Sequence, residues 1–384
     1  FSVVRLETFG TTLLRIPLMG SEDTLKAIAA FCGQQDPHLI DIEDVGQAAN
    51  NQVRCRTVVL GICGTDRDIL ASGSPWVPEG EDHLVLGHEC LAQVEEVGKD
   101  VTGFEEGDWV VPLVRRAKGN GAGRPDLLPP GQYLERGIYG AHGFACSHFN
   151  DAPEFLLHVP EAILDIAVLS EPVSITEKAV REATQLARAR LPDVRKYQPR
   201  VLVTGQGPIA MAAVLTVRSR GWECVMLGRE GPEEPRALLA ADLGADYQPL
   251  SDWVQEHHEY NSAAETRGFD LILECTGSER VMVNVASWLR ALGTMVWVGA
   301  PWVPEKTSLP VGAMMRDAIL RNQLFLGTVN SASTDFEAAF ETLYWFVGQG
   351  ISTERLITER TTLEKSLPLY MMRPENGIKS VVTF

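Results

Sequence analysis

The chain has 384 residues, of which 45% are apolar and 22% charged, and its formal net charge is −17. This length exceeds what one hydrophobic core usually supports, so we expect a globular protein of two domains. No apolar run approaches the ~20 residues that span a bilayer, and the negative charge opposes binding to nucleic acid or anionic lipid. The composition therefore predicts small molecules and further copies of the chain as partners, with no nucleic acid and no membrane.

Residues 1–24 precede the first expected strand and are predicted to form an N-terminal extension. A secretory signal needs a basic start, a continuous apolar core and a cleavage site of small residues, and none of these is clear. The seven cysteines form no C-x-x-C pair and are odd in number. This pattern argues against a disulfide framework and favours a reducing, cytoplasmic location.

Short apolar and alternating runs with glycine turns, such as 52–60 and 90–97, continue to about residue 160. They predict a β-rich, barrel-like domain. Between these two runs stand Cys63 and then His88, which is followed directly by Glu89. A thiolate, an imidazole and a carboxylate are donors that Zn²⁺ takes in tetrahedral sites, and a catalytic site leaves one position open. Thr65 lies two residues from the sulfur, where its hydroxyl can relay a proton.

The spacing of apolar residues over 174–190 predicts an amphipathic helix that connects the domains. After Pro199, apolar strands alternate with helical segments, and this alternation predicts a parallel, doubly wound sheet. The expected strands cover 201–203, 224–227, 271–273 and 294–298. Residues 295–302 offer an apolar subunit surface around Trp302, although a core strand is the favoured interpretation for the first half of this run.

The first of these strands enters the glycine turn Gly205-Gln206-Gly207-Pro208-Ile209-Ala210, which fits the pattern G-x-G-x-x-A and opens a helix. The first glycine makes the tight turn, the second lets the backbone approach a diphosphate, and the small third residue allows close packing. At the end of the second strand NAD enzymes usually present an acid to the ribose. Here Gly228 precedes Arg229, which suits a 2′-phosphate, and Glu230, which repels one. NADP is the first expectation, with NAD accepted as well.

The chain is expected to return to the first domain near 327–330, with a helix over 335–346. We therefore predict a discontinuous catalytic domain over 25–194 and 329–384. The cofactor domain is predicted over 195–328.

Five segments carry a resemblance to a known family: 61–67 around Cys63, 86–89 around His88, 135–144 beginning Glu-Arg-Gly-Ile, 171–179 beginning Glu-Pro, and Val329-Asn330. The chain resembles the zinc-dependent medium-chain dehydrogenases and, within them, the archaeal-type glucose dehydrogenases. The first two segments are shared by alcohol, polyol and threonine dehydrogenases, whereas the later ones resemble the glucose branch more narrowly. The resemblance implies an α/β protein with a β-rich GroES-like catalytic domain and a Rossmann doubly wound parallel-sheet cofactor domain.

The resemblance also implies one catalytic Zn²⁺ per chain, with Thr65 and Glu89 as catalytic residues. The implied metal ligands are Cys63, His88, Glu89 and Glu171, and Glu89 alternates between ligation and release in favour of water. For Glu171 a helix N-terminal acid is the plainer interpretation. The residues 115–125, where many relatives carry a four-cysteine lobe, contain no cysteine, so no structural zinc is expected.

Substrate contacts are implied for Glu135, Glu171 and Asn330, although a surface acid paired with Arg136 is an equal interpretation of Glu135. The implied cofactor contacts are Gly205, Gly207, Pro208, Ile209, Ala210, Gly228, Arg229, Thr276, Gly277 and Val329.

The expected reaction is oxidation of the anomeric hydroxyl of an aldose, above all D-glucose, to its lactone by a homodimer or homotetramer. A polyol, threonine or alcohol dehydrogenase is the alternative within the family. A zinc-independent enone or quinone reductase is disfavoured by the four metal-compatible residues, and a non-catalytic nucleotide-binding protein by the presence of both site patterns.

Overall fold

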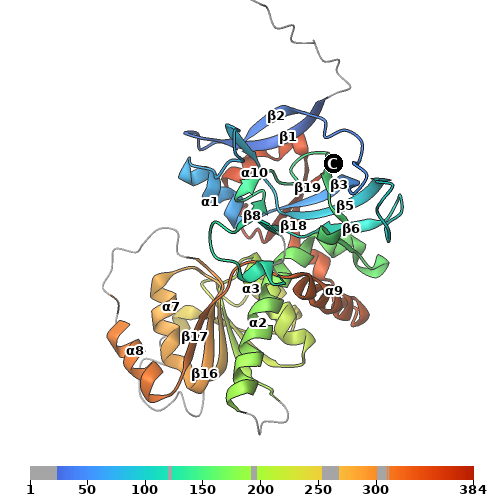
Figure 1. The fold of residues 1–384 in the computed structure, drawn as a ribbon. Coiled ribbons are helices and arrows are strands. Elements are labelled where there is room, and N and C mark those ends of the chain that lie inside the picture. The colour runs from blue at the N-terminus through green and yellow to red at the C-terminus, as the bar shows by residue number, and fades with distance from the viewer. Residues whose placement is uncertain (1–23, 120–122, 192–196, 253–267, 301–308, 310) are drawn as a thin grey trace, which may run out of the picture.

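The computed structural model describes residues 24–119, 123–191, 197–252, 268–300, 309 and 311–384 (Figure 1). The predicted N-terminal extension, apart from Thr24, lies outside the described residues, and so does Trp302 with the surface expected around it. Among the residues described, no helix combines the length and the apolar character that crossing a membrane requires.

The first large sheet is built around β3 (Val53–Ile62), which pairs antiparallel with β5 (Glu89–Val97), β10 (His148–Asp151) and β19 (Lys379–Thr383). The order β11-β6-β5-β3-β19-β18 completes the sheet with β6 (Trp109–Pro112), β11 (Leu156–His158) and β18 (Ile357–Thr362). Strand β3 and the C-terminal strands β18 and β19, which are far apart in the sequence, thus share one sheet in the upper body of Figure 1.

Smaller elements surround this sheet. One three-stranded sheet has the order β2-β1-β4, with β1 (Thr24–Phe31), β2 (His38–Glu43) and β4 (His83–Val85). Another contains β7 (Arg115–Ala117), β8 (Tyr133–Arg136) and β9 (Gly140–Ala141). The helices of this body are α1 (Gly64–Ser72) and α10 (Leu367–Met371), with short 3₁₀ turns at Pro125–Leu127, Pro153–Phe155, Thr353–Leu356 and Leu363–Lys365.

The second large sheet is parallel and has the order β14-β13-β12-β15-β16-β17. Its strands are β12 (Arg200–Thr204), β13 (Glu223–Gly228), β14 (Asp246–Pro249), β15 (Phe269–Glu274), β16 (Leu289–Trp297) and β17 (Leu324–Gly327). The predicted strands are confirmed, although β16 begins five residues earlier and ends one residue earlier than expected. The first half of the run 295–302 belongs to this buried strand.

Helices cover both faces of the parallel sheet, as a doubly wound fold requires. Val201 and Val203 of β12 pack in the core that contains α3 (Pro208–Ser219), whereas Leu202 packs with residues of α7 (Glu279–Val285). The other helical segments of this body are α4 (Pro235–Asp242), a 3₁₀ turn at Ala286–Trp288, and α8 (Val311–Leu320). The alternation along β12 explains why the strand is apolar at every position from 201 to 203.

Two long helices, α2 (Ser170–Arg190) and α9 (Ser333–Gly348), pack against each other, and α2 contacts both β16 of the parallel sheet and β5 of the first sheet (Figure 1). Helix α2 begins four residues before its expected start because the 3₁₀ turn Glu161–Leu169 runs directly into it. Pro172 falls in its first turn, where a missing N–H costs no hydrogen bond. The largest apolar core includes residues of α2, α3, α9 and β19, so the two bodies are joined by packed side chains.

Candidate active site

Cys63 lies at the junction between β3 and α1, as the N-cap residue of that helix. Its backbone N–H donates to Asp66 Oδ2 at 2.8 Å, and Asp66 Oδ1 accepts from the N–H of Gly87 at 3.3 Å. The wholly buried Asp66 therefore ties the cysteine segment to the histidine segment. Thr65 Oγ1 lies 3.7 Å from Cys63 Sγ, so the predicted relay hydroxyl is beside the sulfur.

The antiparallel pairing of β3 with β5 brings the candidate metal ligands Cys63, His88 and Glu89 together. Gly61 lies opposite Glu89 in this register, which places Cys63 next to the turn that carries His88. One donor atom from each of Cys63, His88 and Glu89 lies within 4.8 Å of the others. A side chain on Gly61 would collide with Glu89, because a Cβ there would lie 2.1 Å from Glu89 Oε2. The glycine thus makes room for the carboxylate.

The His88 ring is 3% exposed, and its Nδ1 atom has no hydrogen-bond partner among the described residues. Burial lowers the pKa of His88, but the nearby Cys63, Asp66 and Glu171 outweigh it and raise the pKa well above the usual value. The buried His88 ring has an unsatisfied nitrogen and lies near the thiol of Cys63 and the carboxyl groups of Asp66 and Glu171. A bound cation would be stabilised by these groups. This donor set suits Zn²⁺, so the residues present fit the metal that the sequence implied.

Glu89 also forms a buried ion pair that sequence reasoning missed. Lys379 Nζ donates to Glu89 Oε1 at 2.6 Å and to Oε2 at 2.5 Å, and both side chains are at most 1% exposed. Lys379 is the first residue of β19, whose neighbour Ser380 lies opposite Ile62 of β3. A lone lysine in an otherwise uncharged strand near the C-terminus is the only signal that the sequence offered.

Glu171 is the second residue of α2 and is 8% exposed. Burial raises its pKa to about 7, since the stabilising charge of His88 does not compensate for desolvation and the repulsion of Glu89. Its carboxyl group is not one of the three whose donor atoms lie within 4.8 Å. The carboxyl group of Glu171 thus lies outside the three-donor group, although the charges of His88 and Glu89 act on it.

Glu135 and Asn330 meet although 195 residues separate them. Asn330 Nδ2 donates to Glu135 Oε1 at 3.0 Å, and Arg115 donates to the same oxygen from Nε at 3.0 Å and from Nη2 at 2.8 Å. Glu135 is 8% exposed. The alternative of a surface acid paired with Arg136 is therefore wrong.

Lys178 and the neighbouring backbone hold this polar group in place. Lys178 Nζ, 2% exposed, donates to the carbonyl of Val329 at 2.8 Å and lies 3.2 Å from Asp126 Oδ2. Asn330 itself has a φ of 62°, in the left-handed region that asparagine tolerates better than most residues. Arg115 and Lys178, like Lys379, were not expected from the sequence as parts of the site.

The glycine turn joins β12 to α3 at the point where the strand order reverses. Gly205 has a φ of 101°, and a Cβ there would lie 3.3 Å from Thr276 Cγ2 and 3.6 Å from Ala210 Cβ. Gly207 is the N-cap of α3 and Pro208 its first residue, with Ile209 and the buried Ala210 following. Open α/β sheets bind nucleotides in this crevice at the carboxyl ends of the strands. The turn fits a diphosphate, because side chains at Gly205 and Gly207 would fill the space in which the backbone approaches the phosphates.

The remaining predicted cofactor residues follow neighbouring strands at the same end of the sheet. Gly228 ends β13 and Arg229 follows it, exposed. Thr276 and Gly277 follow β15, and their backbone N–H groups donate to the buried Glu274 at 2.8 and 3.3 Å. Val329 follows β17 and is 64% exposed. The sequence did not single out Glu274, which orders this loop.

Arg373 also reaches the glycine turn, from the segment between α10 and β19. A Cβ on Gly207 would lie 3.3 Å from its Nη1 atom. Burial lowers the pKa of Arg373, and the charges of Arg67 and Arg236 lower it further. The Arg373 guanidinium group beside Gly207, the N-cap of α3, suits the phosphates of a nucleotide.

Glu81, His83 and His142 form a second group whose donor atoms lie within 4.8 Å of one another. The N–H of Val85 donates to His142 Nδ1 at 3.2 Å. This bond fixes the ring proton of neutral His142 on Nε2, so the ring has no lone pair left for a metal. His83 meanwhile contacts Asp82 at 3.0 Å. The first group is therefore the better metal site.

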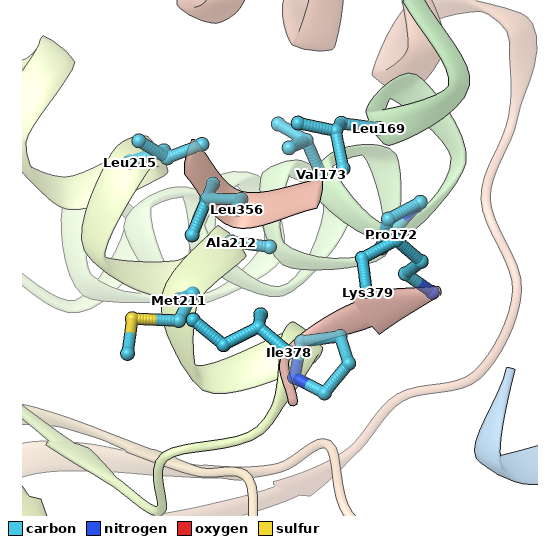
Figure 2. A pocket seen from close by; sticks show the side chains of 10 residues that line it. Leu169, Pro172, Val173, Met211, Ala212, Leu215, Leu356, Ile378 and Lys379 are labelled. Carbon is cyan, nitrogen blue, oxygen red and sulfur yellow. The ribbon is translucent and has the colours of Figure 1, made fainter. Parts of the chain in front are cut away.

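A small cavity separates α2 and α3 from the C-terminal segment (Figure 2). Its lining is almost entirely apolar, and its volume of about 10 Å³ holds at most one water molecule. It is a packing gap beside the site. Its lining residues are Leu169, Pro172, Val173, Pro208, Met211, Ala212, Leu215, Leu356, Ile378 and Lys379.

Two family models together match nearly all of the described chain. The model for the alcohol dehydrogenase GroES-like domain matches residues 49–161, and the model for the glucose dehydrogenase C-terminus matches residues 164–384. The predicted combination of a β-rich GroES-like domain with a Rossmann domain is therefore confirmed.

Among similar proteins, glucose 1-dehydrogenase 1 of Caldivirga maquilingensis is 33% identical over 90% of this chain and 95% of its own. Glucose 1-dehydrogenase of Thermoproteus tenax is 35% identical over 83% of this chain and 88% of its own. A structure of Haloferax mediterranei glucose dehydrogenase in complex with NADP, Zn and gluconolactone matches with a TM-score of 0.78 and 29% identity, covering 94% of this chain and 99% of that one. On the extent of these matches, the chain belongs to the glucose dehydrogenase family of zinc-dependent medium-chain dehydrogenases.

Proposed function

We propose that the protein oxidises the anomeric hydroxyl of an aldose, D-glucose first, to the lactone, with NADP and one catalytic Zn²⁺ per chain. The observation that carries the proposal is the three-donor group of Cys63, His88 and Glu89, which lies in a chain whose relatives are glucose dehydrogenases. A related structure holding NADP, Zn and gluconolactone supports the same cofactors and product class here.

We propose Cys63, His88, Glu89 and Glu171 as the residues that hold the metal. When bound, Zn²⁺ supplies Lewis-acid chemistry that lowers the pKa of a hydroxyl group, and the nicotinamide nucleotide accepts a hydride. Lys379 and Asp66 position this donor set, Lys379 by holding Glu89 and Asp66 by joining the Cys63 and Gly87 segments.

Thr65 is the proposed route for the proton that leaves the anomeric hydroxyl. Its Oγ1 accepts that proton while its own proton passes on toward solvent, since the residue is only partly buried. Together with the hydride lost from the same carbon, this step accounts for both hydrogens that separate an aldose from its lactone. Thr65 has to lie beside the reacting oxygen, and its place 3.7 Å from Cys63 Sγ supports this role.

We propose Glu135, Asn330 and Glu171 as the residues that recognise sugar hydroxyls. The side-chain hydrogen bonds of Glu135 in the described part of the chain all reach Oε1, which leaves Oε2 to accept from a hydroxyl. A site built to pair with hydroxyl groups discriminates strongly against substrates that lack them. A simple alcohol would leave Glu135 Oε2 without the hydroxyl partner that a sugar offers.

The proposed domain division is a catalytic domain over 25–194 and 329–384 and a cofactor domain over 195–328. The sheet membership of β18 and β19 supports it, because both belong to the sheet of β3, whereas β12 to β17 form a separate sheet. The proposed cofactor residues are those at the carboxyl ends of β12, β13, β15 and β17.

We also propose a homodimer or homotetramer in a reducing, cytoplasmic compartment. Helix α8 exposes four large apolar side chains near the edge strand β17, namely Val311 (41%), Met315 (58%), Ile319 (76%) and Leu320 (72%). An exposed apolar patch beside an open sheet edge favours association of copies. All seven cysteines are free, which suits a reducing compartment.

The test of the proposed function is the initial rate of NADP and NAD reduction with glucose, galactose, xylose, threonine and ethanol. Zinc-loaded protein is compared with chelator-treated protein, and metal content is measured alongside. We expect aldose oxidation that chelation abolishes and zinc restores, and a Cys63→Ser variant that retains its fold but holds far less zinc. Turnover of threonine or ethanol alone would contradict the sugar assignment and favour the alternative dehydrogenases.

A further inference from the structure

Glu230 stands at the edge of the cofactor site, where its charge opposes a 2′-phosphate. The strand β13 ends at Gly228, and no side chain fits there, because a Cβ would lie 2.3 Å from Gln206 Cδ and 2.4 Å from Tyr247 Oη. An acidic residue that binds the ribose hydroxyls therefore cannot occupy position 228. Glu230 is the acid closest in sequence to the end of the strand.

Both carboxylate oxygens of Glu230 are already engaged. Oε1 forms an ion pair with Nη2 of Arg236, and Oε2 accepts from Gln206 Nε2 at 3.1 Å. The Glu230 and Arg236 side chains are 17% and 21% exposed, so this pair is shielded from solvent better than an ordinary surface pair. We call the three residues Gln206, Glu230 and Arg236 the Glu230 anchor.

The anchor is tied to the backbone that carries Arg229. Gln206 Oε1 accepts from the N–H of Arg229 at 2.8 Å and from that of Glu230 at 3.3 Å. Tyr247 Oη donates to the carbonyl of Glu230 at 2.8 Å and accepts from Gln206 Nε2 at 2.9 Å. Gln206, which lies between Gly205 and Gly207 in the glycine turn, thus fixes the backbone conformation of the loop that follows β13.

Arg236 occupies the first turn of α4, just after Pro235. A cation there is opposed by the helix macrodipole, so its position does not serve the stability of the helix. Arg236 instead forms the ion pair with Glu230, and its opposite charge reduces the negative potential of this carboxylate at the ribose edge.

We infer that Arg236 is a cofactor-specificity residue, which neutralises and holds back Glu230 so that Arg229 can accept a 2′-phosphate. This inference rests on the proposed use of NADP and goes beyond it by assigning the discrimination between NADP and NAD. With Arg236 removed, the freed carboxylate repels the phosphate and is available to the ribose hydroxyls of NAD.

The experiment measures dissociation constants of NADP⁺ and NAD⁺ by calorimetry, without sugar, for the zinc-loaded wild type and for Arg236→Gln, Glu230→Gln and the double variant. We expect Arg236→Gln to weaken NADP⁺ binding by about tenfold at low salt and by less at high salt, while the dissociation constant of NAD⁺ falls or stays within about twofold of the wild type. Glu230→Gln keeps NADP⁺ affinity. The double variant should match Glu230→Gln to within about twofold, because no carboxylate remains to be neutralised.

The matched control is Arg355→Gln, which removes an exposed pair with Asp242 at the other end of α4 and should leave both constants unchanged. Equal weakening of both nucleotides by Arg236→Gln would mean a structural role and would overturn the inference. A loss of NADP⁺ affinity that persists in the double variant would also overturn it, because Arg236 would then bind the phosphate directly.

Failure of the inference and of the proposed function can be told apart. Nucleotide binding that follows the expected pattern in a protein that oxidises no aldose upholds the inference and contradicts the function. If the wild type oxidises aldoses but binds NADP⁺ and NAD⁺ equally, the proposed function is upheld and the inference is contradicted.

Discussion

At the scale of single residues, the site depends on buried charges that neutralise one another. Glu89 and Lys379 are separated by 290 positions in the chain and meet where almost no water reaches them. Burial lowers the pKa of Lys379, but the carboxylate of Glu89 and the nearby Cys63 reverse this effect and raise it above the ordinary value. Lys379 therefore stays charged and holds the Glu89 carboxylate near Cys63 and His88.

Replacing Lys379 with methionine should destabilise the protein. The change leaves Glu89 buried without its counter-charge, and such losses cost about 3–5 kcal/mol. Urea unfolding of metal-free protein measures the free energy of unfolding directly. The exposed Lys365→Met change is the control and should have little effect, while Glu89→Gln combined with Lys379→Met should recover part of the loss. A Lys379→Met protein as stable as the wild type would refute the importance of the pair.

At the scale of elements, the strand-turn-helix unit formed by β12, the glycine turn and α3 is well specified by local sequence. The apolar run, the two glycines and Pro208 at the first helical position each act within a few residues. The helix start at Ser170 was harder to predict, because it depends on the preceding 3₁₀ turn and on the packing of Leu169 and Val173.

Gly205→Ala should both destabilise the protein and weaken nucleotide binding. A φ of 101° is unfavourable for alanine, and the new Cβ would press on Thr276. Backbone strain of this kind costs about 1–3 kcal/mol. Thermal unfolding and the NADP⁺ dissociation constant are the two measurements. The control is Gly348→Ala in α9, where an added Cβ would meet open space and the φ is not left-handed. Equal behaviour of the two variants would contradict the role of the turn.

At the scale of the whole molecule, the proposed association depends on α8 and the edge strand β17. Leu320→Asp places a charge on the 72%-exposed apolar position and should shift the protein toward monomers, since burying an unpaired charge is costly. Light scattering after size-exclusion chromatography gives the mass. Met372→Asp, at a 73%-exposed position outside α8, is the control. A mass that stays oligomeric in Leu320→Asp would place the interface elsewhere.

The sequence by itself determined the features that act locally. The residues Cys63, His88 and Glu89, the glycine turn and the alternation of strands with helices are each readable within short segments, because donor chemistry, turn geometry and periodicity need no distant partner. Residues such as Glu135 were identified only through a resemblance, and their surroundings were open to two interpretations.

Only the tertiary structure decided which distant groups meet. The pairing of β19 with β3 brings Lys379 to Glu89, the meeting of β8 with the segment after β17 brings Glu135 to Asn330, and the pairing of β12 with β13 brings Gln206 to Glu230. Such contacts follow from strand register and side-chain packing between remote segments, which no local pattern of residues encodes.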